Sequence, residues 1–183
     1  MTHCKSAFLA LLLVGVTPLT VHADNGYLGV YTDATGSSCN FFDPGFAPVT
    51  GYVIHKFSPG GGTAYASRFS LKHPANWQPL SFTTPFAHVG VMQSDLAVNY
   101  GQCITTNTVI GTAMWFSVSP SAACAQLNVQ APDGFPNVVI ADCAFNEVLG
   151  AGLTAYINFT TACCCDCIGT EQSTWGSVKA LYR

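Results

Sequence analysis

The cysteines of this 183-residue chain are unevenly placed, and their placement limits the folds that the chain can adopt. Four of them lie within the five residues Cys163-Cys164-Cys165-Asp166-Cys167. The others are single and lie upstream, at Cys4, Cys39, Cys103, Cys124 and Cys143. Whether this cluster is a set of disulfides, a metal site or a redox centre depends on the compartment in which the protein folds.

The N-terminal residues indicate export. Lys5 precedes the apolar run Ala7–Val16, and Val21-His22-Ala23 has the small-x-small pattern of a cleavage site. The run is shorter than the roughly 20 residues that a membrane-spanning helix needs, so we predict a signal peptide over residues 1–23. No later segment is long and apolar enough for a transmembrane helix, and we expect a protein that is secreted, periplasmic or on the cell surface.

Cleavage would remove Cys4 and leave eight cysteines, an even number. In an exported chain this predicts a disulfide framework. The charge balance is mildly acidic, with a formal net charge of −3 and only 8% charged residues, so the sequence offers no basic face for nucleic acid.

Short segments rich in β-branched and aromatic residues, separated by Gly, Pro, Asn and Asp, fill the chain up to the cluster. Examples are Val49–Phe57, Thr105–Val118 and Leu153–Thr160. Apolar and polar residues alternate in several of them, as expected where one face of a sheet is buried. We therefore predict one all-β domain over residues 24–168, an antiparallel immunoglobulin-like β-sandwich with disulfides.

Two hairpins are predicted from local turn chemistry. The Gly-rich break after Phe57 joins Val49–Phe57 to the alternating run Tyr65–Lys72. The turn sequence Pro132-Asp133-Gly134 joins two further strands. Cys124 and Cys143 lie equally far from this turn, and equal offsets in a hairpin place residues opposite each other. We therefore predict a Cys124–Cys143 disulfide.

Several interpretations of the cluster compete. Disulfides from Cys163, Cys164, Cys165 and Cys167 to Cys39, Cys103 or both would anchor the end of the last strand. Alternatively, Cys164 and Cys167 form a CxxC pair that ligates a metal ion, although thiolate sites usually need two such pairs. A thioredoxin-like site would need a βαβ context that the sequence does not show, and an intermolecular thiol is the fourth possibility. We predict no cofactor.

Catalytic signals are weak, and we predict a non-enzymatic protein. No HExxH, GxSxG or P-loop motif is present. The histidines after the predicted cleavage site are His55, His73 and His88. The carboxylates Asp33, Asp43 and Asp142 lie near strand ends. We consider them as calcium ligands, although Asp is also a common turn former. The aromatic residues Tyr52, Trp77 and Trp115 stack on sugars if exposed, and the commoner role of such residues is core packing.

Residues 169–183 form a tail in which we expect a short amphipathic helix. Ser173 or Thr174 can cap its N-terminus. Its apolar face consists of Trp175, Val178, Leu181 and Tyr182. An isolated helix of about ten residues is marginal in water, so this face is expected to dock on its own domain, another subunit or an export component.

The sequence also resembles known groups. The ending TWGSVKALYR, from Thr174 to Arg183, is similar to the tails of uncharacterised exported bacterial β-sandwich proteins, and the segments Gly29–Cys39 and Val49–Phe57 are similar to their bodies. This resemblance implies a secreted bacterial β-sandwich and no particular activity. The run Arg68–Thr84 resembles cohesin-like and other immunoglobulin-like modules through its strand–turn–strand pattern.

We therefore predict an exported binding or cell-surface structural module whose partner is a protein or carbohydrate surface. The alternative is a metal- or thiol-active protein centred on Cys163–Cys167. A third possibility is a fibre subunit completed by strand donation.

Overall fold

The computed structural model describes residues 25–58, 61–163 and 165, and within these ranges the regular structure is entirely β. The strands are β1 (Tyr27–Tyr31), β2 (Asn40–Phe41), β3 (Ala47–Lys56), β4 (Ala64–Lys72), β5 (Trp77–Thr83), β6 (Ala87–Val91), β7 (Asp95–Ile104), β8 (Thr108–Ser117), β9 (Ala125–Gln130), β10 (Val138–Ala141), β11 (Glu147–Gly152) and β12 (Thr154–Ile157). The predicted signal peptide and tail lie outside the described residues. The described part of the chain contains no helix capable of crossing a bilayer.

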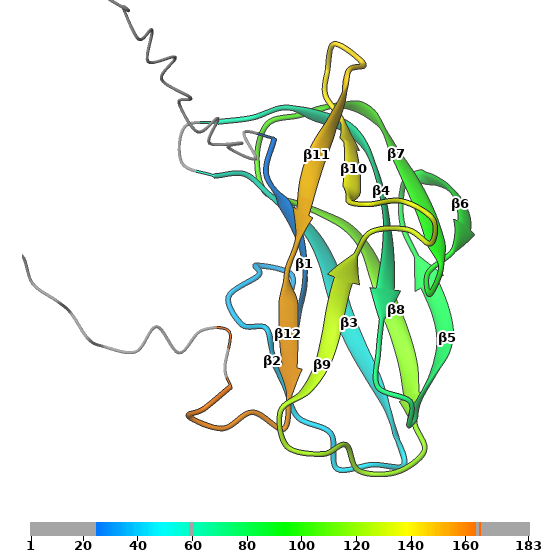
Figure 1. Cartoon of the computed structure of the whole chain (residues 1–183), viewed down its shortest axis with the longest axis vertical. Helices are drawn as coiled ribbons and strands as arrows, with labels where there is room; N and C mark the ends of the chain where they lie inside the picture. The colour runs from blue at the N-terminus through cyan, green and yellow to red at the C-terminus, as the bar shows by residue number, and fades with distance from the viewer. Residues whose placement is uncertain (1–24, 59–60, 164, 166–183) are drawn as a thin grey trace, which may run out of the picture.

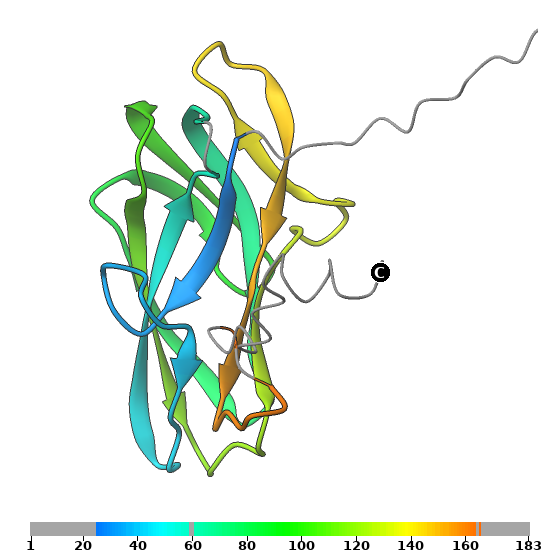
Figure 2. The same ribbon diagram turned by 90° about the vertical axis from the view of Figure 1, so that its left-hand side faces the viewer.

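The strands form two packed layers (Figure 1). One layer has the order β5-β8-β3-β1. The other runs from β6 through β7 to β4, whose second edge pairs with both β9 and β10. Beyond these lie β12 and β11, and β11 also pairs with β1, which joins the two layers along the edge that faces the viewer in Figure 2. The predicted all-β sandwich is confirmed.

Two strand pairs are parallel, in contrast to the antiparallel sandwich that we predicted. They are β1 with β11 and β2 with β12. Both arise because the last long segment of the chain returns alongside the first strands in the same direction. Alternation along a strand indicates its buried face but not the direction of its neighbour, so the sequence carried no signal for this arrangement.

The predicted hairpin around Pro132-Asp133-Gly134 is wrong. Strands β9 and β10 do not pair with each other but lie in line along β4, with Gln130 opposite Ser70 and Val139 opposite Arg68. The loop between them leaves the sheet and returns without reversing the chain. Its turn residues match the local bend, but the partner strand is β4, which only the tertiary structure supplies.

The predicted hairpin between Val49–Phe57 and Tyr65–Lys72 is also wrong. Strand β3 pairs with β1 and β8, whereas β4 pairs with β7, β9 and β10. The two strands therefore belong to different layers, and the glycine-rich connection carries the chain from one layer to the other. Each is a central strand that is hydrogen-bonded on both edges, which pairing between them would not allow.

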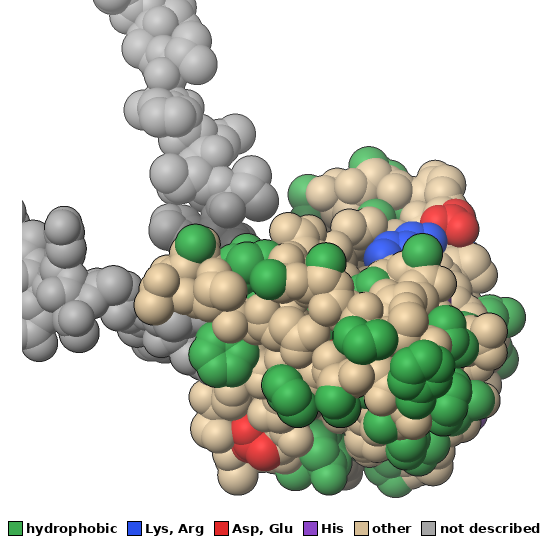
Figure 3. All heavy atoms as spheres, turned by 90° about the horizontal axis from the view of Figure 1, so that it is seen from below, with side chains coloured by type: hydrophobic (Ala, Val, Ile, Leu, Met, Phe, Trp, Pro, Cys, Tyr) green, Lys and Arg blue, Asp and Glu red, His purple; other side chains and the backbone are tan. Residues whose placement is uncertain are grey.

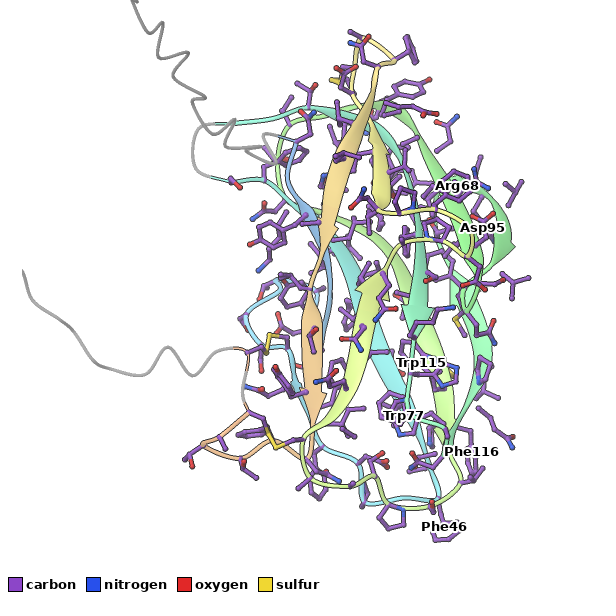
Figure 4. The ribbon with its side chains drawn as sticks, viewed as in Figure 1. Phe46, Arg68, Trp77, Asp95, Trp115 and Phe116 are labelled. Atoms are coloured by element: carbon purple, nitrogen blue, oxygen red, sulfur yellow. A yellow bond between two sulfur atoms is a disulfide. The ribbon has the colours of Figure 1, made fainter. Side chains whose placement is uncertain are left out.

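The core lies between the layers and includes two tryptophans. Trp77 and Trp115 are almost fully buried, with ring centroids 5.6 Å apart (Figure 4). In β8, Trp115 points inward, while Met114 and Phe116 are half-buried on the other face. Packing rather than sugar stacking is thus the role of both tryptophans. Tyr52 is half-buried beside the same core.

Candidate functional site

Among the described residues, three disulfides tie the sandwich together. They are Cys39–Cys165, Cys103–Cys143 and Cys124–Cys163. The predicted Cys124–Cys143 bridge is wrong, because β9 and β10 extend in the same direction along β4 and place these two cysteines at opposite ends of it. Cys163 and Cys165 instead fix the segment after β12 to the β8–β9 loop and to the start of β2.

The bridges bear directly on the metal or thiol interpretation of the cluster. Cys163 and Cys165 are oxidised, and a disulfide sulfur is not a thiolate ligand or nucleophile. Cys164 and Cys167 lie outside the described residues. Within residues 25–58, 61–163 and 165, no three His, Cys, Asp or Glu side chains come together as metal ligands would.

Two of the predicted calcium ligands, Asp33 and Asp142, accept hydrogen bonds from residues of the turns in which they lie. Asp33 accepts hydrogen bonds from the backbone and side chain of Ser37 and from Thr35, and these bonds lower the pKa of Asp33. Asp142 accepts hydrogen bonds from Ala144 N and from the side chain and backbone of Asn146, which lower its pKa. Both carboxylates therefore accept hydrogen bonds within tight turns, in the place of a backbone carbonyl.

Asp43 is different because it is buried, with 1% of its surface exposed. Its Oδ2 accepts hydrogen bonds from Trp77 Nε1 at 2.8 Å, from Ser117 Oγ at 2.9 Å and from the backbone and hydroxyl of Ser121. Gly45 N donates to Oδ1. Burial alone would raise the pKa of Asp43, but these hydrogen bonds outweigh it and lower the pKa. The carboxylate fixes the β2–β3 loop to β5, β8 and the β8–β9 loop.

His55 is a core residue. Its Nδ1 lies 3.0 Å from the hydroxyl of Tyr100 and its Nε2 lies 2.8 Å from the carbonyl oxygen of Asn25. Burial lowers the pKa of His55, so the ring is neutral at pH 7 and its Nε2–H donates to Asn25. The ring also stacks on Phe57. His55 therefore connects the first described residues to the core and has no open face for a substrate.

A hollow lies on the outer face of the layer that contains β6, β7, β4, β10 and β11. It has a volume of about 440 Å³, and we call it the sheet groove. Two rows of side chains, each in register across the five strands, run over this face, and all of their residues except Leu149 line the groove. One row is Val89, Ala97, Arg68, Val139 and Leu149, and the next is Ala87, Asn99, Ala66, Ala141 and Glu147.

The groove exists because its floor is made of short side chains. Ala66, Ala97 and Ala141 point outward from three adjacent strands, whereas their neighbours Ser67, Val98 and Ile140 point into the core. Longer side chains on the outer strands form the walls. Val89 is the apolar one among them, with 71% of it accessible to solvent, and the exposed Leu149 lies beside the groove in the same row.

Arg68, which lines the sheet groove, is part of an ion pair. Arg68 donates from Nε and from one terminal nitrogen to the two carboxylate oxygens of Asp95, at 2.8 and 2.6 Å. The hydrogen bond lowers the pKa of Asp95 and raises the pKa of Arg68. The ring of Phe135 lies 4.1 Å from the guanidinium, which is held between Phe135 and Asp95. Figure 4 shows Arg68 and Asp95 on the same side of the sandwich.

The lining of the sheet groove carries few charges. Among the described residues that line it, the charged ones are Arg68 and Glu147, and Arg68 is already paired. None of the described hydrogen bonds of the lining residues joins a nucleophile to a base. A shallow, largely apolar hollow with an exposed valine in its wall is typical of a surface that contacts another molecule.

Further apolar residues lie at the end formed by the β2–β3 and β8–β9 loops. Phe42, Phe46 and Val118 are exposed there. Figure 3 shows hydrophobic side chains spread over this end, with few charged side chains among them. Phe46 projects from the loop that Asp43 holds in place.

The fold is that of cohesin modules. The cohesin module of a family 33 glycoside hydrolase from Clostridium perfringens superposes with a TM-score of 0.51 at 9% identity, over 75% of this chain and 99% of the module. A type II cohesin domain from the cellulosome of Acetivibrio cellulolyticus gives 0.51 at 12% identity, over 73% and 95% of the two chains. The third ScaB cohesin of R. flavefaciens, solved in complex with a group 1 dockerin, gives 0.50 at 9% identity, over 74% and 96%.

At identities this low, the comparisons establish a shared fold but no shared partner or activity. No family model matches the sequence, and no curated protein matches it either. The structural neighbours agree with the resemblance of Arg68–Thr84 to cohesin-like modules, and this run spans the second half of β4 and all of β5. The predicted likeness of the C-terminal run to exported bacterial tails stays a prediction.

Proposed function

We propose that this protein is an exported, non-enzymatic module that binds a protein partner through the sheet groove. The observation that carries the proposal is the pair of exposed side-chain rows across β6, β7, β4, β10 and β11, with an alanine floor and apolar walls. Monomeric proteins seldom leave a hollow apolar face open to water, and such faces commonly serve as interaction sites. One of the similar cohesins was solved bound to a protein, a dockerin, which supports a protein as the class of partner.

The disulfides support export, because bridges of this kind persist in oxidising compartments. The fibre-subunit alternative has less support. A subunit completed by strand donation leaves the place of one strand open, whereas here β1 occupies the position between β3 and β11. The metal or thiol alternative is not favoured, since Cys163 and Cys165 are already bonded to other cysteines.

The test blocks the groove without disturbing the core. Ala97 lies in its floor, paired with Arg68 on one side and Val89 on the other. Ala97→Tyr would fill the hollow while keeping a residue that strands favour. Thr50→Tyr is the matched control, because Thr50 also points outward from a central strand, in the opposite layer.

The immobilised wild-type protein and both variants would be exposed to the exported proteins of the source organism. Any captured protein would then be purified and titrated against all three. We expect Ala97→Tyr to weaken its binding at least tenfold, roughly the loss of 1.4 kcal/mol, and Thr50→Tyr to bind like the wild type. Equal binding by Ala97→Tyr and wild type would place the contact elsewhere and overturn the proposal.

A further inference from the structure

A second hollow lies on the edge of the sandwich where β1 and β12 come together. It has a volume of about 430 Å³, and we call it the tyrosine cleft. Tyr27, Tyr31 and Tyr156 line it, together with Leu153, Lys56 and the Cys39–Cys165 disulfide. It shares no lining residue with the sheet groove.

The lining of the tyrosine cleft is mixed: three tyrosine rings and Leu153 lie beside Thr154, Gly36 and one charged residue, Lys56. The ammonium group of Lys56 lies 4.2 Å from the centroid of the Tyr31 ring and donates a hydrogen bond to the carbonyl oxygen of Gly36. The one charged group among the described residues of the cleft is therefore already satisfied by the protein. Leu153 is 38% exposed at the junction of β11 and β12. Tyrosine rings beside an exposed leucine suit an occupant that presents aromatic side chains and can also form hydrogen bonds.

The covalent structure brings one such occupant to the cleft. Cys165 lines the cleft, fixed there by its bridge to Cys39 and by the hydrogen bond from Cys165 N to Asn40 Oδ1. The chain continues from Cys165 for 18 residues, from Asp166 to Arg183. Trp175 lies ten positions after Cys165, enough to reach any part of a cleft that begins at Cys165, since an extended residue spans about 3.3 Å.

We propose that the tyrosine cleft is the docking site of the chain's own C-terminal segment, Gln172–Arg183. Its apolar side chains recur at positions that share one face of a helix, and Trp175 and Tyr182 match an aromatic wall. A short tether raises the effective concentration of the segment to the millimolar range, so even a weak intrinsic affinity is enough for docking. Docking would also give this face the partner that an isolated ten-residue helix lacks.

The test uses the whole mature chain with a photo-cross-linker. Trp175 is replaced by benzoylphenylalanine, and Ser177, which lies off the apolar face, is replaced in a matched control. After irradiation, mass spectrometry locates the cross-links. A mixture of ¹⁵N-labelled and unlabelled protein distinguishes links within one chain from links between chains.

We expect links from position 175 to peptides containing Tyr27–Tyr31 or Leu153–Tyr156, within one chain and several-fold more abundant than from position 177. Leu153→Arg, which puts a charge into the cleft, should reduce their yield. A synthetic peptide of residues 170–183 should bind the protein lacking 172–183 with a Kd of about 1 mM or tighter.

Three results would each overturn the proposal: links mainly to another copy, links to the sheet groove, or equal yields from positions 175 and 177. None of them depends on the shortened protein being folded. They are also separate from the test of the proposed function, because Ala97 does not line the tyrosine cleft.

Discussion

Replacement of Asp43 tests how much one buried carboxylate contributes to this sandwich. In Asp43→Ala, two well-buried donors lose their acceptor, Trp77 Nε1 and the backbone N–H of Ser121. The hydroxyl of Ser117 can still donate to Ser119 O. An unsatisfied buried donor costs about 1–3 kcal/mol, so two of them lower the free energy of unfolding by about 2–6 kcal/mol, and we expect about 4.

The assay is urea and thermal unfolding of the oxidised mature protein. For a chain of this size about 1 kcal/mol corresponds to a Tm change of about 2–4 °C, so Asp43→Ala should lower the Tm by about 8–16 °C. Asp43→Asn loses the charge and presents an amide NH2 to Gly45 N. Because it keeps one acceptor oxygen, its decrease in Tm should be smaller than that of Asp43→Ala. Asp142→Ala is the control, because Asp142 holds only its own exposed turn.

The pH dependence provides a second readout. The hydrogen bonds lower the pKa of folded Asp43 below its ordinary value of 3.8, so its stabilisation is fully present above pH 3.8 and is lost as the pH falls through the folded pKa. Asp43→Asn should remove this part of the acid dependence. If Asp43→Ala were no less stable than Asp142→Ala, the carboxylate would not hold the loops and the reasoning would fail.

Three further results are expected. Replacing Cys103 and Cys143 together by serine should cost about 4 kcal/mol in denaturant unfolding, since their bridge closes a 40-residue separation, and an unchanged midpoint would refute this. His55 is buried and neutral, so the free energy of unfolding should fall as the pH drops below 6.5, and His55→Gln should flatten that slope; a parallel slope would contradict it. In Gly152→Ala the new Cβ would lie 2.0 Å from the carbonyl oxygen of Val129. Urea titration should show a free energy of unfolding lower by about 1–3 kcal/mol, and an unchanged value would contradict this close approach.

The sheet groove could be predicted from the sequence only in part. The alternation in Tyr65–Lys72 places Ala66 and Arg68 on the same face, which is the outer face of the sheet groove. Nothing in the sequence indicated that Ala97 and Ala141 would lie beside Ala66, because strands distant in the chain supply them. A stripe of small outward residues is a usable signal only once the strand order is known.

The sequence by itself determined the class of fold. Period-two alternation, β-branched residues and frequent turn formers specify strands with one buried face, and these are local properties that each segment carries alone. The even cysteine count after Cys4 and the apolar N-terminal run are likewise readable without a structure, and they predict export and disulfides.

Only the tertiary structure decided which strands are neighbours and which cysteines meet. Backbone hydrogen bonds in a sheet are nearly independent of sequence, so β9 would pair as well with β10 as with β4 if only local turns mattered. What selects β4 is the simultaneous burial of both layers around Trp77 and Trp115, a property of the whole core. The bridge from Cys124 to Cys163, the sheet groove and the tyrosine cleft all follow from that choice.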